Sequence, residues 1–346
     1  MVAYVRAGAL TNFAEVAREF GLDPAALARA AGLDPRVLSE PGARVPTAKV
    51  ASLLERSAKE AGCPTFALRM ARTRRLADLG AVGLMIAHQP TLGDALATTI
   101  RYRNLVNESL AMSLEEDGDL AILRAELLVE PGVAMRQTDE LAIGTLFRLF
   151  RAVLGARWQP YSVNFAHLAP PDSSFHRSVF GERVEFGCEF NGVVFAAADL
   201  NRPNPAADPA LAEHARSFVD TLPKAQMESM TGEVAKAVYL LLPIGGASIS
   251  QVAQWLGINV RTLQRRLSAE SEAFSDVVAR IRRELATRYL ANPAHSLAEI
   301  ARMLDFAQHS SFTRWFTAEF GMPPAQWRLE ARSRAVAARG RRRRRS

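Results

Sequence analysis

Apolar residues recur at helical spacing in two stretches near the end of the chain, and both stretches follow the same plan. Residues 248–256 and 296–304 each begin with a serine followed three positions later by glutamine or glutamate, a capping-box pattern that predicts the start of a helix. Each stretch then turns into a second helix rich in polar and basic side chains, at residues 261–267 and 310–316. Two short helices joined by a tight turn, with arginine on the second, are typical of a helix-turn-helix. The sequence therefore predicts two copies of this motif.

A single helix is predicted between the two copies. Asn292-Pro293 is expected to end this helix. Its apolar residues are three or four positions apart: Phe274, Val278, Ile281, Leu285 and Tyr289. At about 1.5 Å per residue, roughly 17 helical residues span about 26 Å. Adjacent major-groove faces of DNA lie about 34 Å apart, so a rigid helix of this order could set two recognition helices on successive groove segments, with some bending of the DNA.

The first 200 residues mix helical and strand patterns and predict an α+β domain. Several short helices are expected up to about residue 75, and a longer one at 137–154. The turn Glu116-Asp-Gly118-Asp lies between two alternating stretches and predicts a β-hairpin over residues 111–128. Short strands are expected after the long helix, and Asn191-Gly192 has the composition of a tight turn between the last two; the strands are residues 161–166, 185–190 and 193–197.

A polar, proline-rich stretch separates this part of the chain from the helix-turn-helix motifs. Residues 201–209 contain three prolines and predict a linker. Two helical stretches follow, at residues 210–221 and 227–242, and the second is expected to pack as the first helix of the C-terminal domain.

Charge is distributed unevenly along the chain, whose net charge is +7. Residues 248–346 hold 18 Arg, no Lys and 8 Asp or Glu, a net charge of +10, whereas the preceding residues hold 25 basic and 28 acidic side chains, −3. Part of the excess comes from Arg341 to Arg345, a tail expected to be disordered and nonspecific. An excess confined to the helix-turn-helix segment is what contacts with the DNA phosphate backbone require.

Other classes of protein find little support in the sequence. No glycine-rich phosphate loop, nucleotide fingerprint or serine-hydrolase motif is present. His167 and His176 flank Pro170-Pro171-Asp172, but without metal-ligand spacing they are interpreted as surface or loop histidines, and no metal or cofactor is expected. Two cysteines, Cys63 and Cys188, make neither a disulfide framework nor a cysteine metal site. With neither an apolar run long enough to span a membrane nor a signal peptide, the protein is expected in the cytoplasm.

The C-terminal motifs resemble the DNA-binding domain of AraC/XylS-family transcription regulators. The family usually has glycine at the turn where this chain has Asp305, a residue that tolerates the left-handed conformation better than most. The matching signature is Ile300-Ala301, Leu304, Phe306, Ser311-Phe312, Arg314, Phe316, Phe320-Gly321-Met-Pro-Pro324 and Trp327-Arg328.

The N-terminal half resembles the arabinose-binding-domain-like module found in one branch of that family. The similar phrases are Pro90-Thr-Leu-Gly-Asp-Ala-Leu96, Phe165-Ala-His167, Phe190-Asn-Gly-Val-Val-Phe195 and Asp199-Leu-Asn-Arg-Pro203. The resemblance implies an α+β sensor and dimerisation domain followed by an all-α DNA-binding domain with two helix-turn-helix motifs joined by a long helix. The expected division is residues 1–205 for the sensor, 206–246 for a linker and leading helices, 247–330 for the tandem motifs and 331–346 for the arginine-rich tail.

Candidate DNA-binding residues lie on the second helix of each motif. Leu263 and Leu267 are expected to face inward, which leaves Arg261, Gln264 and Arg265 on the open face, where arginine can bind guanine and glutamine can bind adenine. The resemblance points to the same three positions. Small hydroxyls suit phosphate contacts. The complete candidate set is Arg261, Thr262, Gln264, Arg265, His309, Ser310, Ser311 and Arg314.

The expected function is a DNA-binding transcription regulator, most simply a ligand-responsive activator. Its partners would be promoter double-stranded DNA, RNA polymerase if it activates, an unidentified small-molecule effector and a second copy in a homodimer. One alternative is a ligand-independent repressor or architectural protein whose N-terminal half only dimerises. A DNA-modifying enzyme is more remote, because a methyltransferase with this tandem domain needs a cysteine cluster that two cysteines cannot supply.

Overall fold

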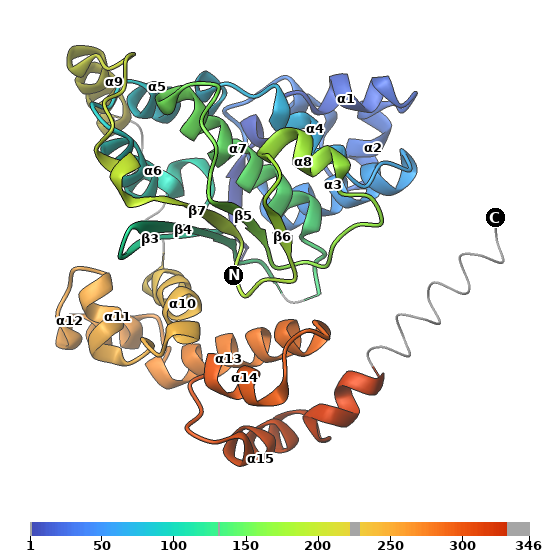
Figure 1. The fold of residues 1–346 in the computed structure, drawn as a ribbon, viewed down its shortest axis with the longest axis vertical. Helices are drawn as coiled ribbons and strands as arrows, with labels where there is room; N and C mark the ends of the chain where they lie inside the picture. The colour runs from blue at the N-terminus through green and yellow to red at the C-terminus, as the bar shows by residue number, and fades with distance from the viewer. Residues whose placement is uncertain (1, 131, 222–228, 331–346) are drawn as a thin grey trace. The chain divides into compact units, whose positions relative to one another are not determined.

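The chain folds into two compact units, Met1–Glu228 and Ser229–Ser346 (Figure 1). The computed structural model describes residues 2–130, 132–221 and 229–330, so the predicted arginine-rich tail lies outside the described residues. The first unit combines helices with sheets and the second is all-helical, as the sequence predicted.

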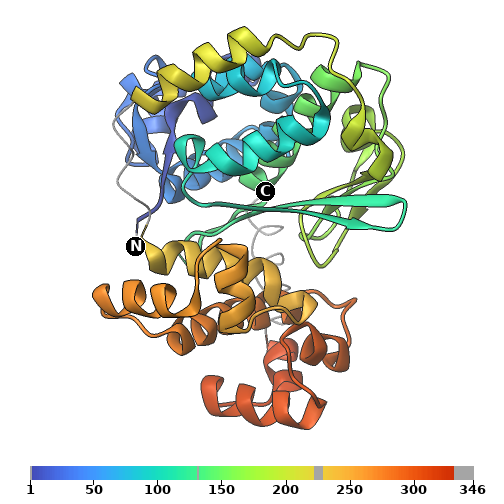
Figure 2. The same cartoon turned by 90° about the vertical axis from the view of Figure 1, so that its left-hand side faces the viewer.

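A five-stranded sheet with the strand order β3-β4-β7-β5-β6 forms one layer of the first unit (Figure 2). β5 and β6 are parallel, and the other neighbouring strands are antiparallel. A separate antiparallel pair joins β1 (Tyr4–Arg6) to β2 (Arg44–Pro46). The strands of the larger sheet are β3 (Leu110–Asp117), β4 (Leu120–Leu127), β5 (Ser162–Phe165), β6 (Val184–Phe186) and β7 (Gly192–Ala196).

The α-helices of this unit cover one face of the sheet (Figures 1 and 2). The longest, α7 (Arg136–Leu154), packs against α3, α4 and β4, and Phe150 on its buried side stacks on Trp158 with the ring centroids 4.7 Å apart. Burial of aromatic rings contributes strongly to such a core. The other helices are α1 (Phe13–Glu19), α2 (Pro24–Ala30), α3 (Thr47–Glu60), α4 (Phe66–Arg72), α5 (Ala81–Ala87), α6 (Leu92–Val106), α8 (Ser174–Phe180) and α9 (Pro209–Thr221), with 3-10 turns η1 (Ala7–Leu10), η2 (Pro35–Leu38), η3 (Leu76–Leu79) and η4 (Ala197–Asn201).

The predicted hairpin forms as β3 and β4, but the turn expected at Asn191-Gly192 does not join two paired strands. β7 pairs with β4 and β5, and β5 lies between β7 and β6. Asn191 instead connects three segments: its backbone and side-chain N–H groups donate to the Glu126 carboxylate at 2.8 and 2.9 Å, and its side-chain oxygen accepts from the Ala166 amide at 2.9 Å. This residue therefore positions β4, β5 and β7 by side-chain hydrogen bonds that local turn statistics do not include.

Residues 201–209 are held against the first unit, contrary to the prediction of a linker. Asn204 is only 5% exposed, and its side chain donates to the carbonyls of Ala87 and Gln89 at 2.8 and 2.9 Å. α9 then packs against α5. The first unit consequently continues past residue 205. Buried hydrogen bonds attach residues 201–209 to this unit, although their composition is typical of a linker.

The second unit contains both predicted helix-turn-helix motifs, α11–α12 and α14–α15, joined by α13. The buried stripe of α13 begins at Val277, which is fully buried, whereas Val278 is only partly buried. The difference arises because α13 packs against both α10 and α14, so the helix buries more than the single predicted stripe. The elements are α10 (Met230–Leu241), η5 (Leu242–Ile244), α11 (Ile249–Trp255), α12 (Val260–Ala269), α13 (Phe274–Ala291), α14 (Leu297–Met303) and α15 (His309–Phe320).

Candidate nucleic-acid interface

Both helix-turn-helix motifs begin with the capping box that the sequence predicted. In the first, the Gln251 amide donates to the Ser248 hydroxyl at 3.3 Å and the Ser248 amide donates to the Gln251 side chain at 3.3 Å. In the second, the Glu299 amide donates to the Ser296 hydroxyl at 3.1 Å and the Ser296 amide donates to the Glu299 carboxylate at 2.6 Å. The backbone hydrogen bond from Ser296 holds the pKa of Glu299 below its usual value. Each cap satisfies amides that the helix itself leaves without acceptors.

The turns of the two motifs have the same backbone geometry. Gly257 and Asp305 both adopt positive φ, at 66° and 62°. The next residue in each turn donates its amide to a carbonyl of the preceding helix, from Ile258 to Ala253 at 3.0 Å and from Phe306 to Ala301 at 2.9 Å. The aspartate thus reproduces a turn for which glycine is the usual residue.

α12, the second helix of the first motif, has one buried face and one open face. Leu263 and Leu267 are 0% and 1% exposed, as predicted from their spacing. Arg261, Gln264 and Arg265 are exposed on the remaining surface. Thr262 is half-buried, and its amide donates to the side chain of Asn259 at 2.8 Å, which caps the helix.

α15 is the corresponding helix of the second motif. Phe312 and Phe316 are fully buried, while His309, Ser310 and Arg314 are exposed and Ser311 is partly buried. Trp315 and Trp327 belong to the aromatic cluster behind this helix, with Trp315 5.2 Å from the Phe306 ring and Trp327 6.3 Å from the Phe316 ring. Both tryptophans are half-buried and serve the packing of the second motif.

Arginines of the second unit fall into two groups according to their partners. Arg283 forms an ion pair with Glu319 at 2.9 Å, and Arg280 with Glu272 at 3.4 Å. Arg282 donates to the Leu304 carbonyl at 3.1 Å, which ties α13 to the second motif. A second group consists of exposed side chains that form no ion pair within the described chain: Arg261, Arg265, Arg266, Arg302 and Arg314.

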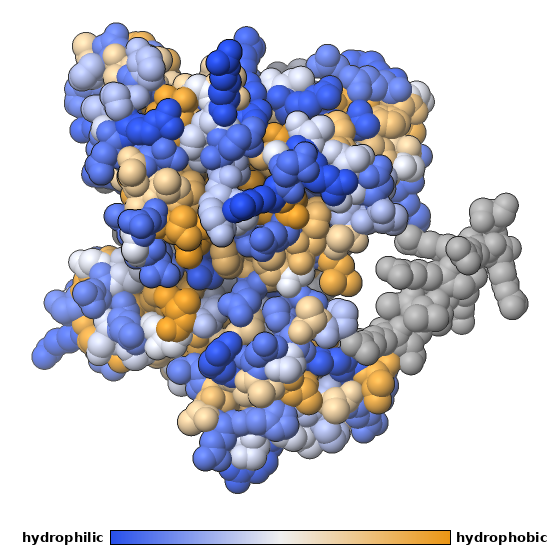
Figure 3. All heavy atoms as spheres, viewed as in Figure 1, coloured by the Kyte–Doolittle hydropathy of each residue, from blue (hydrophilic) through white to orange (hydrophobic). Residues whose placement is uncertain are grey.

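Exposed arginines without a carboxylate partner retain their full charge for a phosphate or a base. Arg266 and Arg302 were not among the predicted candidates. Helical spacing from Leu263 and Leu267 would have placed Arg266 on the surface, but base recognition alone gave no reason to select it. The viewed surface over α12 and α15 is largely hydrophilic (Figure 3).

α10 and α13 position the two motifs. α10 packs against α11, α12 and α13, and the Glu270 carboxylate at the end of α12 accepts the amides of Met230 and Thr231 at 2.6 and 2.9 Å. α13 contains 18 residues. At about 1.5 Å per residue such a helix is about 27 Å long. The second unit therefore presents two polar recognition helices from one helical frame.

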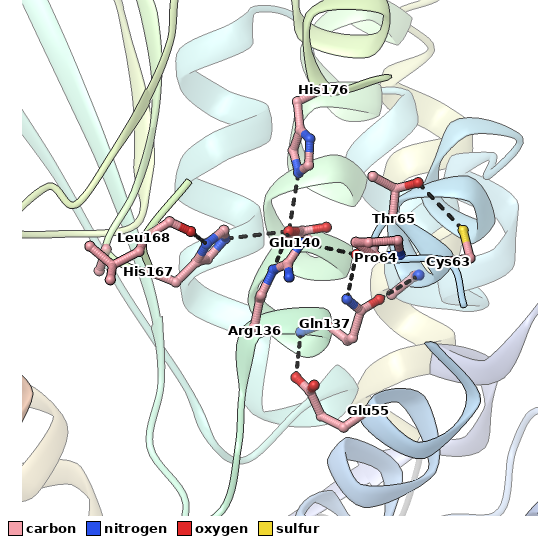
Figure 4. Close-up of polar contacts among 12 residues, drawn as sticks. Glu55, Cys63, Pro64, Thr65, Arg136, Gln137, Glu140, His167, Leu168 and His176 are labelled. Carbon is pink, nitrogen blue, oxygen red and sulfur yellow. Dashed lines mark hydrogen bonds and ion pairs between the residues drawn. The ribbon is translucent and has the colours of Figure 1, made fainter. Parts of the chain in front are cut away.

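His176 is fully buried on α8, contrary to the expectation of a surface or loop position, whereas His167 lies in the loop after β5, as expected, and is half-buried. Nε2 of His176 lies 3.1 Å and Nε2 of His167 3.5 Å from Oε1 of Glu140, which also accepts from Arg136 Nε at 3.1 Å (Figure 4). Burial lowers the pKa of His167, and the negative charge of Glu140 opposes that shift only in part. This cluster could not be predicted from the sequence, because Glu140 lies on α7, far along the chain from both histidines.

Within the described ranges, no group of three or more His, Cys, Asp or Glu side chains is arranged to hold a metal ion. No single helix in those ranges has the length and hydropathy needed to cross a membrane; the pair Met230–Ile244 and Ile249–Trp255 reaches them only together and is bent by 117°.

Comparison with known proteins gives matches over both units. Residues 21–204 match the model of the arabinose-binding domain of AraC transcription regulators, N-terminal, and residues 252–330 match a helix-turn-helix domain. The chain is 30% identical over 326 residues to the HTH-type transcriptional regulator VirS of Mycobacterium tuberculosis, covering 94% of this chain and 96% of that protein. It is 26% identical over 316 residues to the ornithine utilization regulator of Pseudomonas aeruginosa, covering 91% and 93%. The crystal structure of the transcriptional regulator CdpR from Pseudomonas aeruginosa aligns with a TM-score of 0.44 and 19% identity, covering 91% and 97%.

Proposed function

Because this chain belongs to the AraC family of helix-turn-helix transcription regulators, we propose that α12 and α15 read successive major-groove segments of a promoter. Membership confirms the resemblance found in the sequence. It also assigns the protein to DNA-binding regulators rather than enzymes.

The partner-free arginines are the observation that supports this placement most strongly. Elsewhere in the second unit, Arg280 and Arg283 pair with carboxylates of the protein itself. On α12 and α15, by contrast, Arg261, Arg265 and Arg314 are exposed and form no ion pair within the described chain. Positive charge without an internal partner is what an anionic ligand of high charge density such as DNA requires.

We assign different tasks to the two helices. On α12, Arg261, Gln264 and Arg265 contact base edges, since arginine can bind guanine as a fork and glutamine can bind adenine. The Thr262 hydroxyl contacts the DNA phosphate backbone, because its amide already donates to Asn259. On α15, His309, Ser310 and Ser311 bind phosphates and set the register, and Arg314 contacts the groove.

The first unit is proposed to bind a small effector and to form a homodimer, so that each dimer presents four recognition helices to a repeated site. In the cytoplasm, binding of effector would change DNA occupancy and contact with RNA polymerase, giving activation. A ligand-independent repressor with a purely dimerising first unit is the competing function. It predicts that no metabolite stabilises the protein or changes its DNA affinity.

Selection of DNA from a random double-stranded library by the full-length chain, at low and high salt, tests the proposal. The expected result is one enriched motif with two contact blocks about one helical turn, roughly 10 base pairs, apart in each half-site. Salt-sensitive binding without an enriched motif would show that charge alone holds the DNA, and would contradict sequence-specific reading.

A further inference from the structure

The first unit contains a cavity that neither the sequence patterns nor the family comparison assigns to a ligand. Its volume is about 100 Å³, and it lies among β1, η1, α3, α5, α6 and α7. Aliphatic side chains make up most of its wall, including Val50, Val82, Ile86, Leu141 and Leu146. A lining of this kind fits the apolar part of a ligand and offers few groups to a polyhydroxylated one.

One buried guanidinium lies in the wall of this cavity. Arg74 is 4% exposed; it donates to the Gly8 carbonyl at 2.8 Å, to the Ala9 carbonyl and to the Thr145 hydroxyl at 3.4 Å. No carboxylate of the described residues forms an ion pair with it, and burial lowers its pKa to about 10. The negative charge of Asp78, which also lines the cavity, opposes that shift only in part, so an anion beside Arg74 would stabilise the buried positive charge further.

Charge and hydrogen-bonding capacity in the lining agree with an anionic ligand. Arg6 and Arg103 also line the cavity, whereas Asp78 is the single acidic residue among its lining residues. The hydroxyls of Thr47 and Thr138 are buried, with the residues 1% and 6% exposed, and have no hydrogen-bond partner among the described residues. Buried hydroxyls are normally satisfied, so these two are available to a bound molecule.

We propose that this cavity binds a small monocarboxylic acid with an aliphatic body, its carboxylate beside Arg74 and hydrogen-bonded by Thr47 or Thr138. Apolar cavities of about 150 Å³ hold benzene, and a four-carbon acid has as many non-hydrogen atoms as benzene, so about four carbon atoms is the expected size in this smaller cavity and six the upper limit. The proposal rests on the effector-responsive function proposed above and names the chemical class of the effector. A sugar is disfavoured because its hydroxyls would face the aliphatic wall.

Calorimetry and thermal denaturation of the full-length chain with butanoate, pentanoate and hexanoate provide the test. Hexanamide has nearly the same shape without the charge, and L-arabinose represents the polyhydroxylated class. We expect at least one carboxylate to bind and raise Tm, with hexanamide at least about tenfold weaker and L-arabinose without effect. Equal binding of hexanoate and hexanamide, or the absence of carboxylate binding, overturns the proposal.

Variants of the lining residues test whether the ligand binds in this cavity. Ala142 lines it from α7, so Ala142→Phe fills it and should abolish binding; Ala152→Phe, at an exposed position of the same helix, should leave binding unchanged. Thr47→Val and Thr138→Val each remove one unpartnered hydroxyl at nearly constant volume, and at least one of them should weaken binding at least about threefold. Carboxylate binding that survives Ala142→Phe, or unchanged affinity in both threonine variants, overturns the proposal.

DNA affinity measured with and without hexanoate separates this inference from the function on which it rests. Hexanoate that binds without changing DNA affinity supports the cavity assignment and contradicts the effector response. Selection of a DNA motif together with no carboxylate binding leaves DNA reading intact and removes the proposed ligand class.

Discussion

Gly257 and Asp305 occupy the same position in the turns of the two helix-turn-helix motifs, with φ of 66° and 62°. A Cβ built on Gly257 would meet no atom within 4 Å, so the turn needs glycine there for its backbone conformation and not for space. Asp305 has a Cβ and adopts that conformation at an energetic cost that glycine would avoid.

Replacing these residues should change stability in opposite directions. Asp305→Gly is expected to raise the free energy of unfolding of the second unit by about 0.5–1 kcal/mol, and Gly257→Ala to lower it by about 1 kcal/mol. Chemical denaturation measures both. Gly246→Ala is the control in the same unit, because its φ is not in the left-handed region and its Cβ would make only ordinary contacts, at 3.4 Å or more. A loss in Gly246→Ala equal to that in Gly257→Ala would remove the backbone explanation.

The capping serines are exposed, but they should still contribute to the stability of the second unit. Ser296→Ala removes the acceptor of the Glu299 amide and should lower the free energy of unfolding by about 1 kcal/mol. Ser248→Ala should do the same in the first motif. Ser268, near the end of α12, accepts no amide of the described residues through its side chain, so Ser268→Ala should change stability by less than about 0.5 kcal/mol. Equal losses at all three serines would argue against the caps.

Arg265→Ala is expected to affect recognition more than stability. Loss of a forked contact to a guanine should cost about 1–3 kcal/mol at one base pair and relax specificity there. Binding to a selected site and to single-base variants measures the effect. Arg157→Ala, at an exposed arginine of the first unit, is the control and should leave DNA binding unchanged. Uniform weakening on every sequence would reassign Arg265 to a phosphate.

His167, half-buried beside Glu140, should make the first unit sensitive to acid. Burial lowers the pKa of His167 below its usual value of 6.5, so the unfolded chain binds a proton that the folded chain does not. Stability is then fully present above pH 6.5 and is lost as the pH falls below it, by at most about 1.4 kcal/mol per pH unit for one proton. Denaturation between pH 8 and pH 5 should show this loss, and His167→Gln should reduce it. An identical pH profile in the variant would assign the loss to other groups.

The sequence by itself determined the second unit in considerable detail. Serine caps, the turn before Val260, and the inward positions of Leu263 and Leu267 were all predicted and all occur in the structure. These features depend on hydrogen bonds and contacts between residues within a few positions of one another, so a local pattern contains the necessary information. The hairpin and the long helix of the first unit were predicted for the same reason.

Only the tertiary structure decided how distant segments of the first unit meet. Arg74 donates to a carbonyl 66 positions away, and Asn191 to a carboxylate 65 positions away. Insertion of β7 between β4 and β5, the burial of His167 and His176 against Glu140 and the cavity around Arg74 all depend on which helix and strand faces pack together. The packing depends on all the buried surfaces together, so it cannot be inferred from residues that are adjacent in the sequence.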